Sequence, residues 1–318
     1  MQRPYGVLFG LALAGEADAG EAYRPPNRDT LWYTNSLFVR VNPLGLIDTF
    51  RLGYKHRLQV SDTAFGRDAY VFAGASVVAS PAFGRIGAHV EVEPVSPLRF
   101  SATYEFVGYF GTFGQVQGFP GPDVDYSDSA LEVGDEAGRD HPRIGHVLTL
   151  GAQAKFKVEW FAFRNTFTAV RYDLNLPAGE VAFYDQTYDR LAPDGGFLLL
   201  NDLDLMGVFH HLRVGARYTW TDSLYAGSPE TAPGDMPNHR LGPMLAWQFR
   251  DGVDRSRWDR PTIFLLTQWW LQHPWRTGAD TSQALPLIAL GLSFEGDMLW
   301  EGRRGDWKPK EERIPLYP

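Results

Sequence analysis

The sequence predicts an all-β protein whose antiparallel strands, about twelve in number, close into a transmembrane up-and-down β-barrel. Three observations support this prediction: segments in which apolar and polar residues alternate, connections that are alternately long and short, and aromatic residues near the segment ends. Successive side chains of a strand point to opposite faces, so an alternating segment has one apolar and one polar face. Such a strand crosses a bilayer with about nine to eleven tilted residues.

The clearest alternation lies in residues 143–158. One track consists of Ile144, His146, Leu148, Leu150, Ala152, Ala154, Phe156 and Val158. The other track consists of Arg143, Gly145, Val147, Thr149, Gly151, Gln153, Lys155 and Lys157. The run is much longer than the five or six residues usual for a soluble strand, and it is long enough to cross a membrane.

Eleven further segments have strand-like patterns. They span residues 31–42, 49–60, 69–79, 85–93, 98–110, 161–169, 197–209, 212–221, 240–250, 261–272 and 286–296. Residues 179–188 are a candidate thirteenth strand, but we interpret them as part of a loop because an even number of strands fits the connections better.

The lengths of the connections indicate an orientation. With both chain ends in the periplasm, the odd-numbered connections face outside, and these include the long stretches 111–141, 173–195, 222–239 and 273–285. The even-numbered connections near 94–97, 158–160 and 210–211 are short. Bacterial outer-membrane barrels have short periplasmic turns and longer external loops, whereas a soluble sandwich has no reason to alternate them.

Composition and termini narrow the class further. The 318 residues include no cysteine, which excludes disulfides and thiolate metal sites, and the net charge of −8 argues against nucleic-acid binding. Residues 1–19 resemble a secretory signal peptide, the alternative being a buried strand or short helix in an ordinary N-terminus. We expect residues 20–30 and the tail 297–318 to lie in the periplasm on either side of a barrel over 31–296, and the tail is a candidate site for a periplasmic partner.

In these patterns the chain resembles bacterial outer-membrane β-barrels of the porin-like kind. The segment Leu290-Gly291-Leu292-Ser293-Phe294 is similar to a barrel-assembly signal, although the chain continues beyond Phe294. The resemblance implies an outer-membrane location and contact with membrane lipid and lipopolysaccharide.

The polar tracks predict what lines the lumen if the apolar tracks face lipid. They contain the bases Arg51, Lys55, Arg57, Arg99, Arg143, Lys155, Lys157, Arg213 and Arg217 and the acids Glu91, Glu93, Glu105, Asp202 and Asp204. Rings of Arg and Lys favour anions, so one hypothesis is a narrow passive pore for a small anionic solute. The alternative is a non-conducting barrel with a structural or assembly role, whose charged pairs fill the interior.

The long connection 111–141 is acidic. Asp123, Asp125 and Asp128 faintly resemble a calcium loop, but Gly134 occupies the position at which the closing carboxylate is expected. We therefore favour a solvated loop over a Ca²⁺ or Mg²⁺ site, with a constriction loop folded into the barrel as a third possibility. No other cofactor is expected.

Two other function classes remain open. An outer-membrane lipid hydrolase would need a positioned base, and His146 lies on the lipid-facing track with Asn165 as a candidate partner on the next strand. A soluble all-β binding protein would bury the same aromatic residues in a core. We interpret Trp247, Trp269, Trp270, Trp275 and Trp300 as membrane-interface residues, because tryptophan prefers that boundary.

Overall fold

The computed structural model describes residues 28–58, 66, 69–112, 116–225, 232–249, 258–277 and 284–299. The predicted signal peptide lies outside the described residues, as do Trp300 and most of the segments 20–30 and 297–318. Those predictions therefore stay predictions.

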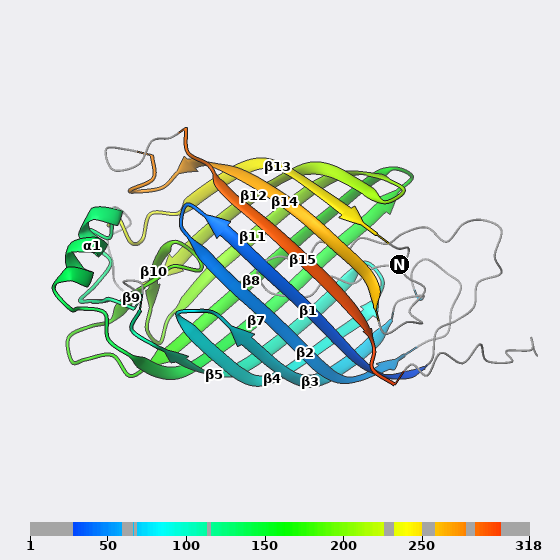
Figure 1. Cartoon of the computed structure of the whole chain (residues 1–318), viewed down its shortest axis with the longest axis horizontal. Coiled ribbons are helices and arrows are strands. Elements are labelled where there is room, and N and C mark those ends of the chain that lie inside the picture. Colours follow the sequence, from blue (N-terminus) through cyan, green and yellow to red (C-terminus); the bar gives the residue numbers. More distant parts are fainter. Residues whose placement is uncertain are drawn as a thin grey trace, which may run out of the picture.

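Twelve antiparallel strands form a closed barrel, as the sequence predicts (Figure 1). In chain order they are β1 Asp29–Val41, β2 Gly45–Arg57, β3 Tyr70–Ala79, β4 Phe83–Val95, β5 Leu98–Tyr109, β7 Arg143–Val158, β8 Phe161–Leu174, β11 Phe197–Phe209, β12 Leu212–Leu224, β13 Asn238–Gln248, β14 Asp259–Gln272 and β15 Leu287–Asp297. Each strand pairs with its neighbours along the chain, and β1 pairs with β15 to close the ring.

Several strands extend beyond their predicted ends. β2 begins at Gly45, β8 continues to Leu174, and β12 continues to Leu224. β4 includes Pro94, although the sequence predicts a turn at this residue. The register of β4 against β5 shifts between Val92 and Val95. Proline has no backbone N–H to donate, so it is tolerated at such an irregularity near a strand end.

The barrel has two dissimilar ends. The first strand begins at Asp29 and the last strand ends at Asp297. Both residues lie at the same end of the barrel, which we call the terminal end. The four longest connections lie at the opposite end, the loop end, where the helix and the short strands gather in Figure 1; they span residues 110–142, 175–196, 225–237 and 273–286. The connections 58–69 and 249–258 are of intermediate length and join strand ends at the terminal end. This arrangement agrees with the predicted parity, while the assignment of the terminal end to the periplasm stays a prediction.

The outer surface of the barrel is apolar. On β7 the side chains of Ile144, Leu150, Phe156 and Val158 are exposed, while Val147 and Thr149 of the alternate track are buried. A closed ring leaves no unpaired strand edge, so its backbone groups are satisfied within a hydrocarbon layer. This exterior contradicts the soluble alternative, which would bury the apolar track. No helix in the described part of the chain is long and apolar enough to cross a bilayer.

Two loop-end connections fold into a small structure of their own. It contains β6 Gly118–Phe119, helix α1 Asp128–Glu136, β9 Ala182–Asp185 and β10 Arg190–Pro193, with the three strands in the order β10-β9-β6. The candidate thirteenth strand is therefore β9, which lies outside the barrel sheet as expected. We call residues Ala182–Pro193 the plug.

One part of the interior differs from the prediction that all inward tracks are polar. On β1, β11, β13, β14 and β15 the inward side chains form an apolar cluster that includes Phe38, Met206, Met244, Phe264 and Leu266. Both tracks of β14 are apolar, so alternation alone could not tell which faces inward.

One of the predicted interface tryptophans lies inside, and another is partly buried at the loop end. Trp247 and Trp269 are exposed on the outer surface, but Trp270 belongs to the interior apolar cluster. Trp275 packs against Tyr126 at the loop end, in the cluster that joins β6, β9 and β10. The prediction was wrong for Trp270, whose neighbours in space come from distant segments. For Trp275 it stays a prediction.

Candidate functional site: the interior and mouth of the barrel

The predicted lumen residues lie on the inward tracks of the strands. Eleven of the fourteen are buried, namely Arg51, Lys55, Arg57, Arg99, Lys155, Arg213, Arg217, Glu91, Glu93, Glu105 and Asp204. Arg143, Lys157 and Asp202 are partly exposed. Their position is as expected, whereas their role in lining a pore stays a prediction.

A first group of charges joins β8, β11 and β12. Asp204 accepts hydrogen bonds from Arg164 Nε at 2.8 Å and from Arg217 Nε and Nη2 at 2.6 and 2.9 Å. Asp202 lies 3.5 Å from Arg217 Nη1. The sequence reasoning missed Arg164, although it occupies the inward track of β8, because the aromatic outer track of that strand dominated the pattern.

A second group joins β4, β5 and β7 toward the terminal end. Glu93 pairs with Arg99 Nη2 at 2.6 Å and with Lys155 Nζ at 2.9 Å. Glu91 accepts a hydrogen bond from Tyr70 and lies 3.7 Å from Arg99 Nε. Each of these buried acids therefore has a cation beside it.

Cations outnumber acids inside the molecule. Among the described residues, thirteen Arg or Lys and nine Asp or Glu side chains are buried. The chain as a whole carries a net charge of −8, so the excess of acids lies outside this buried set. The interior consequently has the opposite sign to the rest of the molecule.

Two cavities lie along the charged side of the interior. The cavity nearer the loop end has a volume of about 50 Å³ and is lined by residues of β1–β5, β7 and the plug. The cavity nearer the terminal end has a volume of about 40 Å³ and is lined by residues of β2, β4, β5, β7 and β8. Arg51 borders both cavities, so a polar route through the barrel would pass this side chain.

The plug occupies the mouth at the loop end. Phe183, Tyr188 and Ala192 pack into a buried apolar cluster with inward residues of β5, β7, β8 and β11. Arg40 of β1 donates hydrogen bonds to the carbonyl oxygens of Thr187, at 2.7 Å, and Gln186. For the connection 111–141 we considered a solvated loop, a metal site and a constriction folded into the barrel. A segment that fills the barrel mouth is present, but it comes mainly from the next long connection, 175–196.

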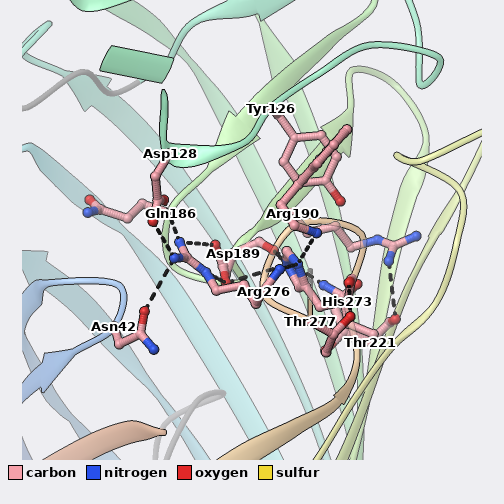
Figure 2. A network of polar contacts seen from close by, with 12 residues as sticks. Asn42, Tyr126, Asp128, Gln186, Asp189, Arg190, Thr221, His273, Arg276 and Thr277 are labelled. Carbon is pink, nitrogen blue, oxygen red and sulfur yellow. Dashed lines mark hydrogen bonds and ion pairs between the residues drawn. The ribbon is translucent and has the colours of Figure 1, made fainter. Parts of the chain in front are cut away.

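A polar group at the loop end, which we call the Asp189 cluster, fixes the plug; it comprises the buried Asp189, His273 and Arg276 and the exposed Asp128 (Figure 2). Arg276 Nε and Nη2 donate to the two carboxylate oxygens of Asp189 at 2.7 and 3.0 Å. The same guanidinium donates to Asp128 of α1 at 2.5 and 2.8 Å. One arginine therefore connects the plug, α1 and the connection between β14 and β15.

The hydrogen bonds of His273 define its protonation. Its Nδ1 accepts from the backbone N–H groups of Trp275 and Arg276, each at 3.1 Å, so Nε2 carries the proton and donates to the Asp189 carbonyl oxygen at 3.0 Å. Burial lowers the pKa of His273 below its ordinary value. Burial raises the pKa of Asp189, but the charge of Arg276 outweighs this effect and holds that pKa well below its usual range.

The other side of the plug is bound to β12. Arg190 Nε donates to Ser223 Oγ at 2.6 Å, and Arg190 Nη2 donates to Asp222 at 3.1 Å and to the Gly234 carbonyl oxygen at 2.9 Å. None of the plug contacts was predicted, because they join residues far apart in the sequence and leave no local periodicity.

The acidic residues considered as metal ligands have other contacts. Asp123 and Asp125 are exposed, Asp125 accepts from the Ser127 backbone N–H at 2.8 Å, and Asp128 binds Arg276. Within the described ranges no group of three His, Asp or Glu residues is arranged to hold a metal ion. The preference for a solvated loop over a Ca²⁺ or Mg²⁺ site stays a prediction.

His146 lies on the outer surface near the loop end. Its ring stacks on Tyr104 at 5.4 Å and contacts Phe106 at 5.7 Å between ring centroids. Asn165 is not its partner: Asn165 lies opposite Ala154 and bonds with Asn201, while His146 lies opposite Asp173. The proposed pairing was wrong because the β7–β8 register places the two residues far apart.

The sequence matches no protein-family profile and no characterised protein. Its fold is similar to those of solved membrane barrels. The KdgM porin aligns with 8% identity and a TM-score of 0.36 over 83% of this chain and 98% of its own. Omp33, an outer membrane protein of Acinetobacter baumannii, aligns with 12% identity and a TM-score of 0.36 over 85% and 99%. The β-domain of the Bordetella autotransporter BrkA aligns with 9% identity and a TM-score of 0.40 over 85% and 100%.

These similarities concern the fold alone. The architecture itself, a closed antiparallel ring with an apolar exterior and a charged interior, is that of a transmembrane β-barrel of the outer-membrane type.

Proposed function

We propose that the chain forms a narrow passive channel for small anions in the bacterial outer membrane. The observation that carries the proposal is the excess of buried cations beside two cavities that meet at Arg51. Fixed positive charge in a confined space of low dielectric constant raises the local concentration of anions and repels cations.

The outer surface supports the membrane location. Exposed Leu, Val, Ile and Phe side chains cover the outer surface of the strands. Exposed tryptophans such as Trp160 and Trp247 lie near the terminal end of the barrel. Hydrocarbon would contact the apolar belt, and the lipid headgroups, including lipopolysaccharide at the loop end, would contact its margins.

Conductance across a planar bilayer tests the channel. We expect a folded sample to carry current, and a KCl gradient to give a reversal potential of the sign set by chloride. Absence of current from a barrel whose gel mobility is heat-modifiable would contradict the channel. Cation preference would contradict the role of the basic interior and leave the pore itself intact.

A pair of variants makes the test specific. Arg51→Gln removes the charge that borders both cavities and should shift the reversal potential toward zero. Arg171→Gln removes a charge exposed on the outside of β8 and should leave it unchanged. Equal shifts in the two variants would mean that overall charge, and not the interior, sets the selectivity.

A second candidate function is a closed barrel with a structural or assembly role. The observation that favours it is the plug, which fills the mouth of the barrel. Hydrogen bonds to Arg40 of β1, to Ser223 of β12 and to Arg276 hold it there. The same bilayer measurement separates the two candidates, because a permanently closed barrel carries no current.

A further inference from the structure

In the described part of the chain Arg85 is a buried cation without an ion pair to an acid. Lys55 and Arg240 share this condition, but of the three only Arg85 lines one of the two cavities described above. The side chain is 9% exposed, and within the described residues no ion pair joins it to an acid. Its guanidinium makes one hydrogen bond there, a long one of 3.4 Å from Nη2 to the Tyr172 hydroxyl, and its buried Nε makes none. A buried charge in this condition is unfavourable unless a further group neutralises it.

Two aromatic rings orient this guanidinium. Its carbon lies 4.8 Å from the centroid of Phe83 and 5.7 Å from that of Tyr172. These two cation–π contacts limit where the guanidinium can lie. A planar guanidinium suits a carboxylate, which can accept two parallel N–H bonds from it.

Arg85 lines the cavity nearer the loop end, together with Arg51 and Glu105. Glu105 is already bonded to Ser76 Oγ at 2.7 Å, and the other nearby acid, Asp185, accepts from the Tyr172 hydroxyl and from the Thr187 backbone N–H. These bonds come from neutral donors and leave both acids charged, but the lining itself contains two arginines and one glutamate, so its net charge is positive.

The remaining walls of this cavity are of two kinds. Hydroxyl groups come from Ser36, Thr49, Thr103 and Thr149, and apolar surface comes from Phe38, Ile47, Val78 and Tyr188. Thr187 and Tyr188 belong to the plug, so the cavity lies directly beneath it. A ligand with one anionic end and a short apolar body would satisfy both kinds of wall.

We propose that this cavity is a binding site for a small organic carboxylate, with Arg85 as the residue that recognises the carboxylate. The inference extends the proposed anion channel by naming a subsite and a solute class. Binding to the site can be measured without any current, so the two proposals can fail separately.

Saturation-transfer NMR with butyrate as the probe tests the site in protein reconstituted in deuterated lipid nanodiscs. We expect a saturable signal for the full chain and at least tenfold weaker binding for Arg85→Gln. Arg85→Lys keeps the charge but loses the planar edge, and should bind more weakly than the natural chain. Arg171→Gln, on the outer surface, is the control and should bind as the natural chain does.

A second variant guards against misfolding of the first. Val78→Phe reduces the cavity volume without changing Arg85, and should weaken butyrate binding in a barrel that is still heat-modifiable. Equal binding by the natural chain, Arg85→Gln and Val78→Phe would overturn the proposal. Saturable binding of inorganic phosphate with no binding of butyrate would also overturn the carboxylate assignment. Absence of current with intact, Arg85-dependent butyrate binding would contradict the channel alone.

Discussion

At the scale of single residues, Asp204 neutralises two arginines that come from different strands. Its carboxylate is fully buried between Arg164 and Arg217. Removing one member of a buried ionic group is unfavourable because it leaves the remaining charges uncompensated in a poorly polarisable interior.

We therefore expect Asp204→Asn to lower the free energy of unfolding by about 3 kcal/mol. Asp202→Asn on the same strand is the matched control and should cost about 1 kcal/mol or less, because Asp202 is partly exposed and its bond from Thr219 Oγ1 can be kept. Urea unfolding of the barrel in lipid vesicles measures both variants, and equal losses would show that Asp204 has no special role.

Gly291 is another residue whose size matters. A Cβ added there would lie 2.0 Å from Phe264 and 2.5 Å from Phe38, inside the apolar cluster. We expect Gly291→Ala to lower the free energy of unfolding by about 1–3 kcal/mol, because the aromatic rings must shift. Gly108→Ala is the control, since nothing lies within 4 Å of its added Cβ. The added change Phe264→Leu should restore part of the loss in the same urea measurement.

The sequence predicted residue positions well where polar and apolar tracks differ, as for Lys155 on β7. It failed for Trp270, whose strand is apolar on both tracks, so that the direction of each side chain depends on the register with neighbours. That Arg85 forms no ion pair with an acid of the described residues could not be predicted at all, because ion pairing depends on contacts between strands.

At the scale of elements, the turn 273–277 responds to pH through His273. The pKa of His273 in the folded turn lies below the ordinary value of about 6.5. Between these two pKa values the imidazole is neutral in the folded turn, whereas it takes up a proton when the turn opens. The resulting stabilisation is complete above about pH 6.5 and is lost as the pH falls toward the folded pKa. Asp189, with its lowered pKa, stays ionised in this range and loses its contribution only below about pH 4.

We expect the backbone N–H groups of Trp275 and Arg276 to exchange faster with deuterium at pH 5 than at pH 7.5, after correction for intrinsic rates. Protonation of Nδ1 removes the acceptor for both groups. His273→Asn is the control, because its side-chain oxygen can accept the same bonds without titrating. Equal pH dependence in the variant would mean that another group opens the turn.

The elements of the loop end were the least predictable. The strands β9 and β10 have four residues each, too few to give a periodic pattern, and all of their residues are buried. The turn between them is bonded by Arg40 and Arg276 from two distant segments. Arg190 of β10 donates to Ser223 of β12. The sequence did show that 173–195 is a long connection, but not that it folds inward.

At the scale of the whole molecule, the barrel was predictable because lipid imposes one rule on every strand. Alternate residues must be apolar around the entire outer surface, so each of the twelve strands repeats the signal. Whether the interior conducts depends on how far the plug and the inward side chains fill it, and this depends on tertiary contacts.

Replacing the plug tests its role in the whole molecule. Gly195 N–H bonds to the Tyr172 carbonyl oxygen at 2.8 Å, so β8 and β11 already approach each other where the connection leaves and re-enters the sheet. A short Gly-Ser linker in place of residues 176–194 can therefore join them without moving either strand. We expect heat-modifiable gel mobility to persist, because the twelve-stranded ring is closed without the plug, and single-channel conductance to rise severalfold, because Thr187 and Tyr188 no longer cover the cavity beneath. A folded variant with the conductance of the natural chain would show that the narrowest part of the route lies deeper, where Glu93, Arg99 and Lys155 meet.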